Sequence, residues 1–145
     1  MHALIRYMHK DYVKADQWSE QVIGAAIEVH RHKGPGLLEE IYERCLMREF
    51  ELRRMPASNQ VIAPLEYKGI TLDQALRLDV IVDRCLIVEI KAVERVLPVH
   101  KAQLLSYMKL MDAPIGLLIN FHVSLLKDGI SRMVLRGADM DDVDF

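Results

Sequence analysis

The chain has 145 residues, of which 51% are hydrophobic and 28% charged, and its formal net charge is −2. This length suits one domain, which buries roughly 70% of its unfolded surface and needs no disulfide or structural metal to fold. The slight negative charge excludes a global attraction for nucleic acid, so any such binding must use a local basic patch. No stretch approaches the ~18 apolar residues of a membrane span, and no apolar signal segment is present, so we expect a cytoplasmic protein without membrane contact.

Two helices are expected first. Residues 1–15 show no clear pattern and form an arm of uncertain structure. From Asp16 apolar residues recur with the helical period, and the run HRHKGPG ends this helix with its glycines and proline. A second helix is expected over residues 36–54, followed by a loop over residues 55–59.

The period then changes to two, which indicates β-strands. Three strands are expected, over residues 60–67, 70–83 and 85–93. Lys68 and Gly69 form the first turn between them, and Asp83 with Arg84 makes the second, tighter connection. The two cysteines, Cys45 and Cys85, match no zinc spacing and are expected to be reduced thiols in the core.

The last third of the chain contains one helix and two strands. Pro98 begins a helix over residues 98–113, and proline is favoured in a first helical turn. Residues 114–121 are almost continuously apolar, as in a strand buried on both faces, with Asn120 as a polar group at its end. Residues 124–136 predict another strand with a turn at Asp128-Gly129, and residues 137–145 an acidic mobile tail. The order α-α-β-β-β-α-β-β predicts a single α/β domain over residues 1–145.

Two acids and a base interrupt strands that otherwise look buried. Because side chains alternate along a strand, Asp79 shares one face of its strand with Arg77, and Glu89 shares a face of the next strand with Lys91. A two-residue turn would place Asp79 opposite residue 88, one position from Glu89. A small bulge would then bring the acids and Lys91 together on one face.

Adjacent carboxylates repel each other and are costly to desolvate, so something must compensate for them. A lysine compensates for one charge, and a divalent cation compensates for more. Oxygen-only ligands suit Mg²⁺ or Mn²⁺. The sequence therefore predicts a hard-metal site, and the alternative is a solvated outer face of the sheet on which these charges have no special role.

The same residues resemble a known signature. Asp79 followed by Glu89-Ile90-Lys91 is similar to the motif of the PD-(D/E)XK nuclease superfamily. QLLSY is similar to the Q-x-x-x-Y element of its RecB-like members and contains Gln103 and Tyr107.

More narrowly, five blocks between about residues 19 and 136 resemble the GxxExxR protein family of uncharacterised bacterial and archaeal proteins. They are GPGLLEEIYERCL, LDVIVD, LIVEIKAV, HKAQLLSYMKL and GLLINF. If the label is read from Gly36 and Glu39, the arginine of this family would fall at Tyr42.

The resemblance implies an αβββαβ core, a mixed sheet flanked by helices, and metal-dependent hydrolysis of nucleic acid, either DNA or RNA. Asp79, Glu89 and the carbonyl of Ile90 would coordinate Mg²⁺ or Mn²⁺. Glu39, on the helix before the strands, would ligate directly or through water.

The resemblance also implies roles for three catalytic side chains. Lys91 would position the attacking water or stabilise developing charge. Gln103 and Tyr107 lie one helical turn apart and would orient Lys91 or contact a phosphate. A group of basic residues would supply a rim that binds phosphate, and the alternative is that they are scattered surface charges. They are Arg31, His32, Lys33, Lys68, Arg77, Arg95 and Lys101.

Each residue also has a purely structural alternative. Glu39 would be a first-turn charge favourable to the helix dipole, His100 an exposed residue at a helix start, and Tyr107 a core aromatic. As a whole, the chain could be a catalytically inactive nuclease-fold binding module. It could also be an interaction protein whose exposed strand edge makes a homodimer, with the Met-rich helix 98–112 at the interface, although the cluster of Met108, Leu110 and Met111 suits a core better.

Overall fold

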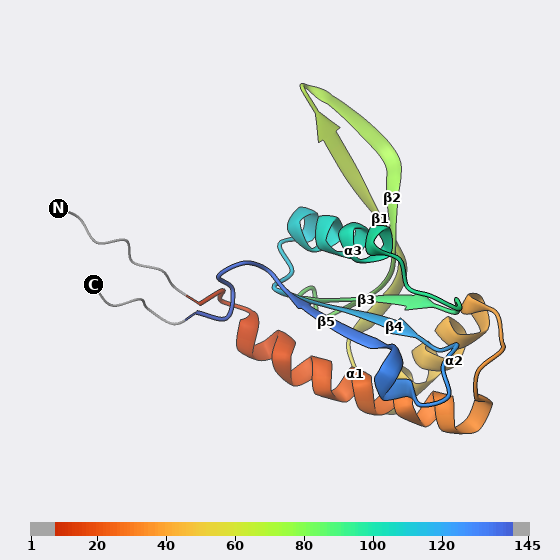
Figure 1. Ribbon diagram of the computed structural model, residues 1–145. Helices are drawn as coiled ribbons and strands as arrows, with labels where there is room; N and C mark the ends of the chain where they lie inside the picture. The colour runs from red at the N-terminus through yellow and green to blue at the C-terminus, as the bar shows by residue number, and fades with distance from the viewer. Residues whose placement is uncertain (1–7, 141–145) are drawn as a thin grey trace.

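The computed structural model describes residues 8–140 of the chain (Figure 1). Three α-helices, five strands and a short 3₁₀ helix lie within this range. In chain order they are α1 (Tyr12–Lys33), α2 (Glu39–Leu52), β1 (Ala57–Tyr67), β2 (Ile70–Val82), β3 (Leu86–Lys91), α3 (Pro98–Met111), β4 (Ile115–Asn120), η1 (Leu126–Gly129) and β5 (Ile130–Val134).

The strands form one mixed sheet in the order β1-β2-β3-β4-β5. β3 and β4 run parallel, and α3 lies in the crossover between them, whereas all other neighbouring strands are antiparallel. Figure 1 shows α3 on one face of the sheet and α1 and α2 on the other. The predicted fold class, a mixed sheet flanked by helices with an αβββαβ core, is confirmed.

The central strands are buried on both faces, which explains why their sequences are almost continuously apolar. All of β4 is buried, as is all of β3 except Lys91. On one face Val88 packs in a cluster with residues of α1 and α2, and on the other Ile87 packs with Leu104 and Met108 of α3. Met108 is fully buried, so the Met-rich helix contributes to the core.

Some element boundaries differ from the prediction. The first helix begins at Tyr12 rather than at Asp16, and β1 begins at Ala57, inside the segment expected to be a loop. The segment before β5 forms the 3₁₀ helix η1 and not a strand. There the backbone passes so close to the end of β4 that a Cβ on Gly129 would lie 2.1 Å from the Asn120 carbonyl oxygen.

The connection between β2 and β3 is one residue longer than predicted. Val82 pairs with Leu86, so the loop contains Asp83, Arg84 and Cys85. The first two adopt left-handed conformations, with φ of 49° and 58°. The added residue places Val80 opposite Val88, and Asp79 therefore comes level with Glu89 without a bulge.

The alternation expected along β2 also breaks. Val80 packs with the α1 and α2 side of the core, as does Val82, whereas Leu78 packs with the α3 side. The sheet partner of this segment is irregular as well, because Gln60 of β1 has a positive φ of 51°. Strict alternation would place Leu78 on the same face as Val80, and the structure departs from it at Asp79.

The β1–β2 hairpin extends beyond the rest of the sheet. Figure 1 shows its outer half projecting past α3. The register shifts between Ala63 and Leu65, around Pro64. Tyr67 and Ile70, beside the turn, are exposed.

The described ends of the chain lie together. The backbone N–H of His9 donates to the carbonyl of Ala138 at 2.9 Å, and Ala138 is buried. Half of the expected N-terminal arm and acidic tail, residues 1–7 and 141–145, lies outside the described residues. Between residues 8 and 140, no helix has the length and apolar character needed to cross a membrane.

The packing of α3 on the sheet gives a stability prediction. A Cβ on Gly116 of β4 would lie 2.6 Å from the Met108 sulfur and 2.9 Å from a Leu104 methyl carbon, both fully buried. We expect Gly116→Ala to lower the free energy of unfolding by about 1–3 kcal/mol, as overpacking does. Chemical denaturation of the purified variants would measure the change.

Gly24→Ala in α1 is the matched control. A Cβ there would meet only the terminal guanidinium nitrogen of Arg53, at 3.3 Å, and that group can move. Because alanine is favoured over glycine inside a helix, this variant should be neutral or up to about 1 kcal/mol more stable. Equal effects of the two substitutions would contradict the packing described for α3.

Candidate active site

The acidic residues predicted from the sequence lie where two strands separate. β2 and β3 pair through only three residue pairs, from Val82–Leu86 to Val80–Val88. Before Val80, β2 continues with β1 into the projecting hairpin, whereas β3 continues beside β4 (Figure 1). Asp79 and Glu89 are the first residues beyond the paired segment. They therefore occupy the fork between two diverging parts of the sheet.

At this fork, side-chain carboxyl groups take the place of the backbone hydrogen bonds between β2 and β3. The N–H of Ile90 donates to Oδ2 of Asp79 at 2.9 Å, and the N–H of Asp79 donates to Oε1 of Glu89 at 3.2 Å. Each acid is thus held by the strand that carries the other, so the pair is fixed by backbone geometry.

Burial makes this pair costly to ionise. Glu89 is only 5% exposed, and its burial, together with the nearby Asp79 carboxylate, raises the pKa of Glu89 to about 8. Burial also raises the pKa of Asp79, although the hydrogen bond from Ile90 opposes this effect. The pair therefore retains a proton near neutral pH when no cation is bound.

Lys91 and Tyr107 approach the acids from two directions. The Lys91 ammonium lies close enough to lower the pKa of both acids, but it forms no ion pair with either within 4.0 Å. Tyr107 of α3 is buried, and burial and the negative potential of Glu89 raise its pKa. Gln103 is exposed and acts to lower the pKa of Tyr107, so it adjoins the site beside that tyrosine.

Glu39 lies at the other side of the β3 terminus. Its Oε1 accepts a hydrogen bond from the N–H of Ala92, directly after Lys91, at 3.2 Å. Asn120 holds the same segment, because its side chain accepts from the N–H of Val93 at 3.0 Å and donates to the Val93 carbonyl at 2.8 Å. The backbone that carries Lys91 is thus fastened to both α2 and β4.

Tyr42 occupies the position at which the GxxExxR pattern would have arginine. It is fully buried and stacks on Phe121, with 4.5 Å between the ring centroids. Its hydroxyl donates to the Gly34 carbonyl at 2.5 Å and accepts from the N–H of Leu37 at 3.1 Å. The tyrosine therefore fixes the glycine-containing loop that leads into Glu39, and the buried ring leaves no place for a charged side chain.

Glu43 is an acid that the sequence analysis missed. It lies one helical turn after Glu39, and its negative charge contributes to the raised pKa of Asp79. Its two oxygens accept from the side-chain amides of Asn59, at 3.0 Å, and Gln60, at 2.7 Å. The i, i+4 spacing from Glu39 was the available signal, but the pairing with β1 required the fold.

Several other candidates have local partners. His100 accepts a hydrogen bond from the N–H of Leu97 at 3.0 Å and so caps the start of α3, where it is half-buried rather than exposed. Arg31 and His32 both pair with Glu28, at 3.7 and 2.8 Å. Arg31 and His32 therefore share a carboxylate partner and do not form an unpaired part of a phosphate-binding rim.

Few side chains at the fork could ligate a metal ion. In the part of the chain that the structure describes, no three His, Cys, Asp or Glu side chains form a group that could hold a metal ion. Mg²⁺, however, usually retains several waters and needs only one or two carboxylates from the protein. Asp79 and Glu89, two oxygen donors whose joint ionisation is opposed by burial, meet that requirement.

The buried pair predicts an unusual pH dependence of stability in metal-free protein. Because the pKa of Glu89 is higher in the folded than in the unfolded chain, its proton stabilises the fold fully below pH ~4.5, and this contribution is lost as pH rises to about 8. Glu89→Gln mimics the protonated form. Its free energy of unfolding relative to the wild type should therefore rise by roughly 3–4 kcal/mol between pH 5 and pH 8.

Denaturation in a chelator at several pH values measures this difference. Glu40→Gln is the control, because Glu40 is exposed in the first turn of the same α2 that carries Glu39. Its difference from the wild type should not change between pH 5 and 8. A constant difference for Glu89→Gln as well would show that Glu89 ionises normally in the folded protein.

Comparison with known proteins supports the assignment that the geometry suggests. The family model of the PD-(D/E)XK nuclease superfamily matches residues 16–133. A solved structure titled "Crystal structure of SSO0001" is 22% identical to this chain and matches 72% of it, with a TM-score of 0.45. The match covers 50% of the solved chain, so this chain spans about half of that protein's length. None of the curated proteins matches the chain. The chain belongs to the PD-(D/E)XK nuclease superfamily.

Proposed function

We propose that this protein is a metal-dependent nuclease that hydrolyses phosphodiester bonds in nucleic acid. The observation that carries the proposal is the buried Asp79–Glu89 pair at the strand fork, beside Lys91. Two desolvated acids held together cost free energy when both are ionised, so their placement favours a functional role. Membership of a nuclease superfamily supplies the reaction class.

Asp79 and Glu89 would hold the metal, together with the carbonyl of Ile90. Glu39 would reach it directly or through water. When bound, Mg²⁺ or Mn²⁺ lowers the pKa of a coordinated water and neutralises charge on the phosphoryl group. The fork suits this role because the hydrogen bonds to Asp79 and Glu89 come from backbone N–H groups, which fix both carboxylates before any ion arrives.

The remaining residues would act on water and on the phosphate. The Lys91 ammonium has no carboxylate within 4.0 Å in the described residues, so it can position a water or stabilise developing negative charge. Tyr107 faces the same acids, and Gln103 beside it would orient its hydroxyl toward Lys91 or a phosphate oxygen. Glu43 would add a second acid from α2 near Asp79.

The substrate would be DNA or RNA, held by local contacts because the chain as a whole is slightly acidic. Lys101 at the start of α3 and Arg77 on β2 are exposed basic residues without a carboxylate partner within 4.0 Å in the described region. An inactive nuclease-fold module that binds nucleic acid without cutting it would use the same rim, and the tests below separate the two.

Metal binding should release a proton. Because burial raises the pKa of Glu89 to about 8, Mn²⁺ must displace its proton at neutral pH, and the apparent affinity should rise up to about tenfold per pH unit between pH 6 and 8. Calorimetry in two buffers of different ionisation enthalpy would count the protons. Asp79→Asn should abolish binding, whereas Glu40→Gln should leave it intact. Binding that does not vary with pH would contradict this donor pair.

Lys91 gives the sharpest test of catalysis. With Mn²⁺ and a mixture of single-stranded DNA, duplex DNA and RNA, the wild type should cleave at least one substrate, and Lys91→Ala should be slower by a factor of about 100 or more. Lys109→Ala, which removes an exposed lysine on α3, is the matched control and should retain full activity.

Identical cleavage by wild type and Lys91→Ala would indicate a contaminating nuclease. Metal binding and substrate binding without cleavage would instead establish the inactive module. In that case Lys91→Ala should weaken binding of a labelled oligonucleotide, and the affinity should fall with added salt.

A further inference from the structure

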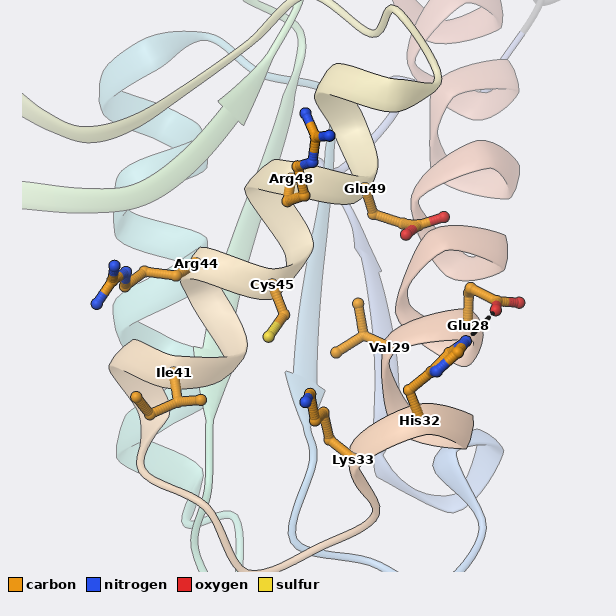
Figure 2. A pocket seen from close by; sticks show the side chains of 9 residues that line it. All are labelled: Glu28, Val29, His32, Lys33, Ile41, Arg44, Cys45, Arg48 and Glu49. Atoms are coloured by element: carbon orange, nitrogen blue, oxygen red, sulfur yellow. Dashed lines mark hydrogen bonds and ion pairs between the residues drawn. The ribbon is translucent and has the colours of Figure 1, made fainter.

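A second concave site lies away from the strand fork, between α1 and α2. It is a cavity of about 530 Å³, within the range of small-molecule sites. Its lining residues are Glu28, Val29, His32, Lys33, Ile41, Arg44, Cys45, Arg48 and Glu49 (Figure 2). None of them belongs to the acidic fork or to its Lys91 and Tyr107 neighbours.

The two helices supply an apolar floor. Figure 2 shows Val29 of α1 and Cys45 of α2 pointing toward each other across the gap between the helices. Val29 is buried, and Ile41 and Cys45 are half-buried, so a ligand would cover apolar atoms that are still partly open to water. Filling such a surface is favourable by roughly 25 cal/mol for each Å² removed from water.

The charges around this floor do not cancel. Glu28 forms ion pairs with Arg31 and His32, and Oε1 of Glu49 lies 3.2 Å from Nε of Arg53. Arg48 forms an ion pair with Glu51.

Two cations of the lining remain. Lys33 and Arg44 have no carboxylate within 4.0 Å in residues 8–140. In Figure 2 the Lys33 amine extends into the gap toward Cys45. The cavity therefore combines an apolar floor with unpaired positive charge.

We propose that this cavity binds a small organic anion, with its apolar body against Val29, Ile41 and Cys45 and its carboxylate, sulfonate or phosphate on Lys33. Arg44 also lines the cavity, but Figure 2 shows its side chain extending away from α1 and from Lys33. A cationic ligand would meet the unpaired Lys33 ammonium, since the acids of the lining already have partners. A neutral apolar ligand would leave that ammonium without a counter-charge.

Anilinonaphthalene sulfonate is a suitable probe, because it joins an aromatic body to one anionic group and fluoresces when its water is removed. Phenylnaphthylamine, which lacks the sulfonate, is the uncharged comparison. We expect the sulfonate dye to bind the folded protein with one site and at least about fivefold more tightly than the uncharged dye. Equal affinities, or no binding of the sulfonate dye, would overturn the proposal.

Cys45 reports whether the dye occupies this cavity. Cys85 is fully buried, and burial raises its pKa to about 11, so a thiol reagent should react rapidly at Cys45 alone. Cys45→Ser should remove the rapid reaction and confirm this. Saturating sulfonate dye should slow labelling of Cys45 in the wild type. Binding with an unchanged labelling rate would place the dye elsewhere, for example on the exposed hairpin, and would overturn the assignment.

Charge variants complete the test. Lys33→Gln should weaken the sulfonate dye by about fivefold and leave the uncharged dye unchanged, whereas Lys33→Arg should retain the difference between the dyes. Lys10→Gln changes the net charge equally at an exposed lysine outside the cavity and should have no effect. A Lys33→Gln variant that binds as tightly as the wild type would contradict the proposed role of the lysine.

Discussion

The exchange of backbone for side-chain hydrogen bonds between β2 and β3 determines the geometry of the candidate site. Beyond Val80 and Val88 the two strands separate, and the N–H groups of Ile90 and Asp79 would lose their ladder partners. The carboxyl groups of Asp79 and Glu89 accept from these N–H groups instead. The acids therefore have a structural task as well as a chemical one, because they close the end of the ladder.

This arrangement places an energetic cost at the centre of the sheet. Glu89 is held between α3 and β4 with almost no exposure, and its proton must be lost before it can bind a cation. The surrounding elements limit any relaxation: Asn120 and Glu39 fasten the backbone after Lys91, and Tyr42 fixes the loop before Glu39. A divalent cation is the group that would remove the cost without moving these elements.

Much of the fold was predictable because its signals are local. The apolar runs of β3 and β4, Pro98 at the start of α3 and the change of period after residue 59 each depend on neighbouring residues. Asp79 and Glu89 were predictable as neighbours from the hairpin, although the alternation along β2 fails between Leu78 and Val80. The extra residue in the loop, Cys85, was not predictable, because its inclusion depends on how Val82 and Leu86 pair within the sheet.

What the sequence could not supply depends on contacts between distant segments. The side-chain amides of Asn59 and Gln60 hold Glu43 near the site. Gln60 has a positive φ, which its residue type does not predict. A turn at Asp128-Gly129 was predicted, but its 3₁₀ form and the close approach of Gly129 to Asn120 depend on how the chain passes the end of β4. The helix α2 connects these features to the rest of the molecule, since it carries Glu39 and Glu43 beside the sheet and Cys45 in the cavity that it shares with α1.

The most direct test follows the carboxyl carbon of Glu89 by NMR during a pH titration, with and without Mg²⁺. In metal-free protein this carbon should titrate with a midpoint near 8, and saturating Mg²⁺ should keep it ionised to a much lower pH. A midpoint near that of an exposed glutamate, about 4.5, unaffected by Mg²⁺, would contradict the account that Asp79 and Glu89 form a buried, proton-sharing pair that binds a cation.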